Sequence, residues 1–88
     1  MGYAIKRDRF IVPATYDSLV CGERYVYKSK EYDRYYVQSK YIFDDNLELF
    51  VTEDLNKAKK ILALVHEVWT TDFYIIGIND DGTEVNID

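Results

Sequence analysis

The sequence is poor in cysteine, proline and glycine. The one cysteine, Cys21, excludes an intrachain disulfide, and a chain without disulfides is typical of a reducing compartment. The four glycines are scattered singly, so the chain has no glycine-rich phosphate-binding loop. The longest uninterrupted apolar run, Ile61–Val65, is far shorter than a membrane-spanning helix requires. We therefore expect a soluble, cytoplasmic protein that does not interact with membranes.

Residues suited to metal binding or covalent catalysis are also few. Cys21 and His66 are the only thiol and imidazole in the chain, whereas a zinc site needs three or four ligands. A Cys21–His66 nucleophile pair would lack a third residue to orient the histidine. Residues 79–82, Asn-Asp-Asp-Gly, lack the alternating ligands and closing glutamate of a calcium loop and favour a plain turn. The sequence thus predicts a non-enzymatic protein with no cofactor and no metal.

Charge and tyrosine are distributed unevenly along the 88 residues. Eight of the nine tyrosines lie within residues 1–41. Residues 1–40 contain four lysines and four arginines against five acids, whereas residues 41–88 contain three lysines against eleven acids. The two halves therefore carry +3 and −8, which gives the net charge of −5. A single domain spanning residues 1–88 can present one acidic and one basic surface, and such surfaces steer association with charged partners.

Short-range patterns in the first half predict strands. Two strand-like pieces lie within residues 3–12, separated by a charged turn near Arg7 and Asp8, and residues 14–23 favour a loop. Strict alternation over residues 24–30 and 34–43 predicts a hairpin whose turn is Glu31-Tyr32-Asp33. We expect the tyrosines of this hairpin to pack beneath a helix, with their hydroxyls at the rim.

The second half predicts one helix and a second hairpin. Residues 52–69 carry apolar side chains at helical spacing, with Thr52 as the N-cap and Glu53 and Asp54 in the first turn. An apolar strand follows at residues 73–78, then an Asp81-Gly82 turn and a return strand. The predicted order is β-β-β-β-α-β-β. This order is an α+β domain with a mainly antiparallel sheet of five to six strands and one helix on one face.

Residues 24–78 carry a recurring arrangement: Tyr-Val-Tyr-Lys, then Tyr-Tyr-Val, an acidic loop, and Phe-Val-Thr-Glu-Asp-Leu-x-x-Ala-Lys-Lys-Ile before a closing apolar strand. In this respect the chain resembles many small uncharacterised proteins encoded by bacteriophages and prophages. The resemblance implies a phage-like context and assigns no role to any residue. Some small acidic phage proteins inhibit host defence or nucleic-acid enzymes by occupying a surface meant for nucleic acid.

An acidic cluster falls on the loop before the helix and on the helix start. Carboxylates at this density can imitate a nucleic-acid backbone and bind an arginine- and lysine-rich groove, although they also suit a solvated loop and the N-terminus of a helix. We therefore expect a binding protein, in the manner of a phage-type inhibitor, that meets a basic protein partner through this surface. Its residues are Asp44, Asp45, Glu48, Glu53 and Asp54.

The alternative is a small nucleic-acid-binding module. Residues 24–40 interleave cations with tyrosines, and such a stretch can track phosphates while its rings stack on bases. Alternation argues against this function, because Tyr25 and Tyr27 point to the face opposite Lys28. The cations concerned are Arg24, Lys28, Lys30, Arg34 and Lys40.

Overall fold

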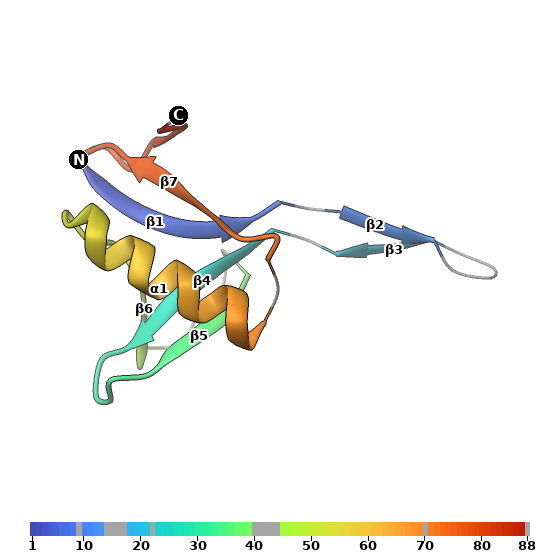
Figure 1. Ribbon diagram of the computed structural model, residues 1–88, viewed down its shortest axis with the longest axis horizontal. Coiled ribbons are helices and arrows are strands. Elements are labelled where there is room, and N and C mark those ends of the chain that lie inside the picture. The colour runs from blue at the N-terminus through green and yellow to red at the C-terminus, as the bar shows by residue number, and fades with distance from the viewer. Residues whose placement is uncertain (9, 14–17, 22, 40–44, 70, 88) are drawn as a thin grey trace.

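A computed structural model describes residues 1–8, 10–13, 18–21, 23–39, 45–69 and 71–87, with the backbone alone for 10–13 and 18–21. A six-stranded antiparallel sheet is covered on one face by a helix, which confirms the predicted α+β class and element order (Figure 1). The sheet consists of β1 (Gly2–Arg7), β4 (Arg24–Ser29), β5 (Tyr35–Gln38), β6 (Leu47–Leu49), β7 (Tyr74–Ile78) and β8 (Glu84–Val85).

Strand order in the sheet is β5-β4-β1-β7-β8, and β6 pairs with β4. Because β5 occupies one edge of β4, the strands β1 and β6 divide the other edge between them. β1 pairs with the start of β4, at Arg24 and Tyr25, and β6 pairs with its end, at residues 27–29. Strand β6 was not predicted, because its three residues lie within the expected acidic loop.

Beyond the sheet, β2 (Phe10–Pro13) and β3 (Ser18–Cys21) form a separate two-stranded ribbon, here called the arm, which projects from the body (Figure 1). The predicted hairpin within residues 3–12 is therefore wrong, because β1 pairs with β4 and β2 pairs with β3. The pairs Arg7↔Arg24 and Phe10↔Cys21 belong to one register, so the arm keeps the register in which β1 pairs with β4. The arm includes residues 18–21, which were expected to form a loop.

Helix α1 (Leu55–Val68) lies within the predicted range but begins later than expected. Asp54 is its N-cap, because the Asp54 Oδ1 accepts hydrogen bonds from the backbone amides of Asn56 (2.9 Å) and Lys57 (3.4 Å). Thr52, the predicted cap, instead accepts from the amide of Asp54 at 3.1 Å. No helix in the described ranges is long and apolar enough to cross a membrane.

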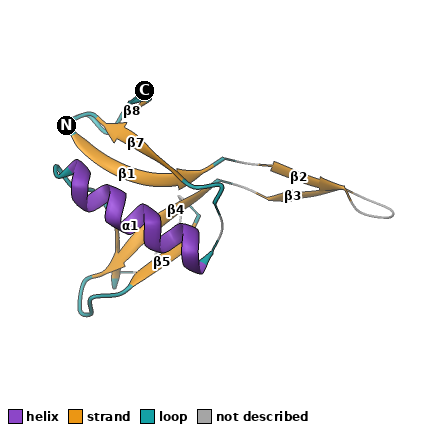
Figure 2. Cartoon of the chain, viewed as in Figure 1, coloured by secondary structure: helices purple, strands orange, loops and turns teal. Residues whose placement is uncertain are grey.

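The sheet has a hydrophobic cluster on each face. Beneath α1 (purple in Figure 2), Val65 packs with Ile5, Val26 and Phe50. Adjacent residues of a strand point to opposite faces, so the neighbours of these residues form the second cluster. That cluster is built from Ala4, Tyr25, Tyr27 and Ile76.

The position of the tyrosines corrects a prediction. Tyr25 and Tyr27 are buried on the face away from the helix, whereas we expected them beneath it. Among the tyrosines that the structure describes, only Tyr35 joins the helix-side cluster, where its ring meets Phe50 edge-on with centroids 5.5 Å apart.

Candidate functional site

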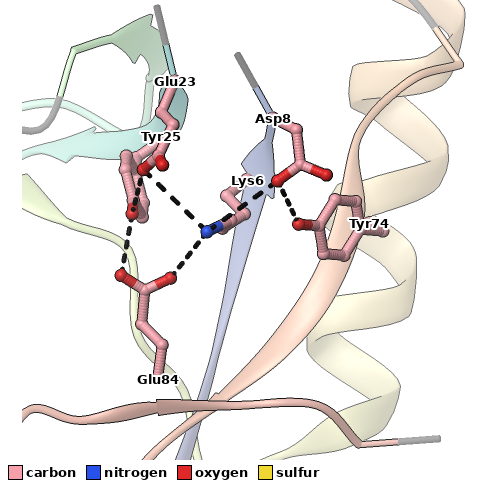
Figure 3. Close-up of polar contacts among 6 residues, drawn as sticks. All are labelled: Lys6, Asp8, Glu23, Tyr25, Tyr74 and Glu84. Carbon is pink, nitrogen blue, oxygen red and sulfur yellow. Dashed lines mark hydrogen bonds and ion pairs between the residues drawn. The ribbon is translucent and has the colours of Figure 1, made fainter.

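A row of three polar side chains crosses the face opposite the helix. Lys6 of β1 is the register partner of Tyr25 on β4 and of Tyr74 on β7, so the three residues stand side by side (Figure 3). The Lys6 ammonium lies 5.7 Å from the centroid of the Tyr25 ring, within range of a cation–π interaction. Lysine is thus held between two aromatic side chains and largely removed from water.

Three carboxylates surround this lysine. The Lys6 Nζ donates to Glu84 Oε1 at 2.9 Å and lies 3.9 Å from Glu23 Oε2 and 4.0 Å from Asp8 Oδ1. The Tyr25 hydroxyl lies within hydrogen-bond distance of Glu84 Oε2 (2.8 Å) and of Glu23 Oε2 (3.1 Å). The Tyr74 hydroxyl donates to Asp8 Oδ1 at 2.6 Å (Figure 3). These six residues, from four strands and the two sides of the arm's base, are called the Lys6 cluster.

The three proton donors of the Lys6 cluster have raised pKa values. Burial by itself lowers the pKa of Lys6, but the hydrogen bond and charge of Glu84, with the charges of Glu23 and Asp8, outweigh it and raise the pKa. Burial, then the hydrogen bonds to Glu84 and Glu23, raise the pKa of Tyr25. Burial and the hydrogen bond to Asp8 raise the pKa of Tyr74 to about 12. Lys6, Tyr25 and Tyr74 therefore stay protonated at neutral pH and are unsuited to accept a proton there.

Negative charge remains on the cluster after its ion pairs are formed. Three carboxylates against one ammonium leave a net charge of about −2 at neutral pH. The side chains of Asp8 and Glu23 are 70% and 47% exposed, so part of this charge faces solvent. The Lys6 cluster therefore stabilises the junction between sheet and arm and contributes a local negative potential.

The predicted acidic cluster is divided in the structure. Asp45 is exposed just before β6, and Glu48 is exposed within it. Glu53 and Asp54 precede α1. Glu48 is the register partner of Lys28, yet no ion pair joins their side chains. Asp54 is occupied as the N-cap. Asp44 lies outside the described residues.

The acids of the last hairpin are occupied by local contacts. Asp80 lies 3.6 Å from the N-terminal ammonium, and Asp81 Oδ1 accepts from the Thr83 amide at 2.9 Å. Hydrogen bonding by Thr83 lowers the pKa of Asp81. The turn has three residues, 80–82, in place of the predicted two, because the Asn79 amide donates to the Thr83 carbonyl; Gly82 takes the left-handed conformation with φ of 86°.

The predicted basic hairpin does not place all its cations on one surface with exposed rings. Arg24 and Lys28 share the helix-side face with Val26, opposite the buried Tyr25 and Tyr27. Within the described part of the hairpin, residues 24–39, only the turn combines the two kinds of residue: Lys30, Tyr32 and Arg34 are all exposed there, Tyr32 to 65%. Lys40 lies outside the described residues.

Sequence patterns missed the Lys6 cluster. Lys6 and Glu84 are 78 positions apart, and their contact depends on the pairing of β1 with β7 and of β7 with β8. The one local signal was alternation, which places Lys6 on the same face as Ala4 but says nothing of neighbouring strands.

His66 has a structural contact. Its Nε2 lies 2.8 Å from the Phe73 carbonyl oxygen, which ties the end of α1 to the start of β7. In the described part of the chain, no group of three or more His, Cys, Asp or Glu side chains is arranged to hold a metal ion.

These observations define a small α+β domain with a projecting β-ribbon, an ion-pair cluster at its base and exposed carboxylates along β6 and before α1. Comparison of this chain with protein-family models, curated proteins and solved structures finds no match.

Proposed function

We propose that this protein is a non-enzymatic binding protein that engages a basic protein surface through its own carboxylates. The supporting observation is that Asp45, Glu48 and Glu53 are exposed and form no ion pair with any described residue. Carboxylates of this kind can accept charge-assisted hydrogen bonds from lysine or arginine, and arginine can bind them in bidentate fashion. These three residues are the part of the predicted acidic cluster that has no structural task within the described residues.

The charge of the whole chain supports the same function. A net charge of −5 attracts a basic partner over a distance and raises the rate of encounter. Asp8 and Glu23 extend the negative potential to the base of the arm. A surface that normally binds phosphates is rich in arginine and lysine, so a nucleic-acid enzyme of the host is the partner that we propose, in keeping with a phage-type inhibitor.

The proposal is tested by capture and titration. The tagged chain is used to capture proteins from bacterial lysate, and the captured protein is purified. Its binding to the chain is then titrated at about 50 and 200 mM salt, because salt screens exposed charges and weakens binding that depends on them. The variant Asp45→Asn/Glu48→Gln should bind roughly tenfold or more weakly, since each charge-assisted hydrogen bond contributes about 1.5–3 kcal/mol. Its affinity should also depend less on salt.

A matched control variant loses the same number of negative charges at other positions. Glu67→Gln/Asp80→Asn removes two exposed carboxylates from α1 and the last turn and should bind like the wild type. Equal affinity of the two double variants would contradict a role for the β6 carboxylates, and so would capture of no protein with a basic surface.

A second candidate is a nucleic-acid-binding module, favoured by one observation: Lys30, Tyr32 and Arg34 are exposed together at the β4–β5 turn. A ring flanked by cations suits a single strand, because the ring stacks on a base while the cations meet phosphates. Binding of the wild type to a fluorescent single-stranded oligonucleotide, lost in Lys30→Ala/Tyr32→Ala, would favour this candidate over the first.

A further inference from the structure

The C-terminal half of α1 carries an apolar stripe that nothing in the described part of the chain covers. Leu64 and Val68 are one helical turn apart and are 41% and 60% exposed, and Trp69 at the helix end is 42% exposed. The buried residues of the helix are Ala58 and Val65, and Val65 packs with Ile5 and Val26 of the sheet. An exposed tryptophan beside two aliphatic side chains is a composition typical of the centre of a protein interface.

This stripe forms one wall of an open groove of about 280 Å³. The other wall is the start of β5, where Tyr35 and Tyr36 are half-buried. β5 is an edge strand, so the groove lies at the border of the sheet. The groove is separate from the Lys6 cluster, which involves neither α1 nor β5.

Two neighbouring residues of opposite charge stand at the rim of the groove. Asp33 and Arg34 both line it, both are exposed, and neither forms an ion pair with a described residue. An acidic partner would be repelled by Asp33 and a basic partner by Arg34. A second copy related by a two-fold axis can pair with both charges, because Asp33 of each copy then meets Arg34 of the other.

We propose that two copies of this chain associate through the groove, with the apolar stripes of α1 packed together and Asp33 of each copy facing Arg34 of the other. The interface is isologous, and Trp69 lies near its centre. This inference concerns a different surface from the β6 carboxylates and stands independently of the proposed function.

The self-association is measured by analytical ultracentrifugation over a wide range of protein concentration. Trp69 is the only tryptophan, so its fluorescence reports on the groove directly. The wild type should dimerise as concentration rises, and its emission should shift to shorter wavelength in parallel. Val68→Asp should abolish both changes, whereas Ile87→Asp, at another exposed apolar position, should leave them unaltered. Circular dichroism melts confirm that both variants are folded.

A charge exchange then tests the partner and the symmetry. Asp33→Arg and Arg34→Asp should each weaken the dimer roughly tenfold or more, and the double variant Asp33→Arg/Arg34→Asp should restore it. In a mixture, wild type and double variant should pair with themselves and not with each other, because the mixed dimer sets like charges together. A wild type that stays monomeric at every concentration would overturn the proposal, and so would a double variant that dimerises equally well with wild type.

Discussion

Lys6 occupies the central strand β1, with its ammonium drawn out of water and its positive charge balanced by carboxylates from distant parts of the chain. A lysine in this position is stabilised only while its partners remain, because a buried charge without a partner is costly. The phenols of Tyr25 and Tyr74 are neutral and donate their protons to Glu84 and Asp8, so losing those protons would place a negative charge beside each carboxylate. At the scale of single residues, the stability of the protein therefore depends on protons that are lost at alkaline pH.

We expect the protein to lose stability as the pH rises above about 10, and Tyr74→Phe to reduce the steepness of that loss. Folded Tyr74 keeps its proton up to a pKa of about 12, whereas an unfolded tyrosine releases it near pH 10. The folded state therefore binds more protons in this interval, and the free energy of unfolding falls with rising pH. The raised pKa values of Tyr25 and Lys6 act in the same direction. Thermal melts at several pH values between about 8 and 11 measure the slope.

Tyr32→Phe is the matched control for this measurement. It removes an exposed phenol that forms no hydrogen bond within the described residues, so its slope should equal that of the wild type. An equal slope for Tyr74→Phe and wild type would show that the contact between Tyr74 and Asp8 does not hold the proton in solution.

At the scale of elements, the two acids before α1 differ in their contribution to stability. Asp54→Ala should lower the free energy of unfolding by about 1 kcal/mol, because the amides of Asn56 and Lys57 lose their acceptor. Glu53→Ala, one residue earlier, should change it by a few tenths of a kcal/mol at most. Urea unfolding of both variants measures the difference. A larger loss for Glu53→Ala than for Asp54→Ala would place the cap elsewhere.

Elements with a strong local pattern were predicted correctly. Helix α1 and the β4–β5 hairpin follow from periodicity within a few residues, since packing on one face requires that periodicity, and strand β7 follows from its apolar run. The pairing of β1 was not predicted, because the choice between a hairpin with β2 and a ladder with β4 depends on contacts far apart in sequence. The side of the sheet occupied by Tyr25 and Tyr27 follows from that same register.

The candidate surfaces were predictable only in part. Exposure of Asp45, Glu48 and Glu53 agrees with their placement in a charged loop and at a helix start, where solvent is expected. The Lys6 cluster and the groove beside Trp69 required the fold, since each joins side chains from elements that are remote in the chain. Trp69, which lines that groove, is 42% exposed at the helix end.

At the scale of the whole molecule, the arm keeps the register in which β1 pairs with β4. Removing residues in facing pairs should therefore leave the body intact: deleting Val12 with Leu19 and Pro13 with Ser18 shortens the arm without moving Asp8 or Glu23. We expect the melting temperature of this variant to stay close to that of the wild type, as measured by circular dichroism.

An unpaired deletion provides the contrast. Removing four residues from one side only, Phe10–Pro13, leaves β3 without its partner strand and pulls on Asp8 at the base. This variant should melt at a clearly lower temperature than the paired deletion of the same size. Equal melting temperatures would show that the arm and the sheet are not coupled through their common register.

The register shared by the arm and the β1–β4 pair also bears on how such a chain changes over generations. A codon gained or lost on one side of the arm turns every following side chain on that side to the other face, unless a second event on the opposite side restores the match. Lineages descended from this gene are therefore expected to vary in arm length by even numbers of residues, added in facing pairs. The residues at the base of the arm then keep their pairing.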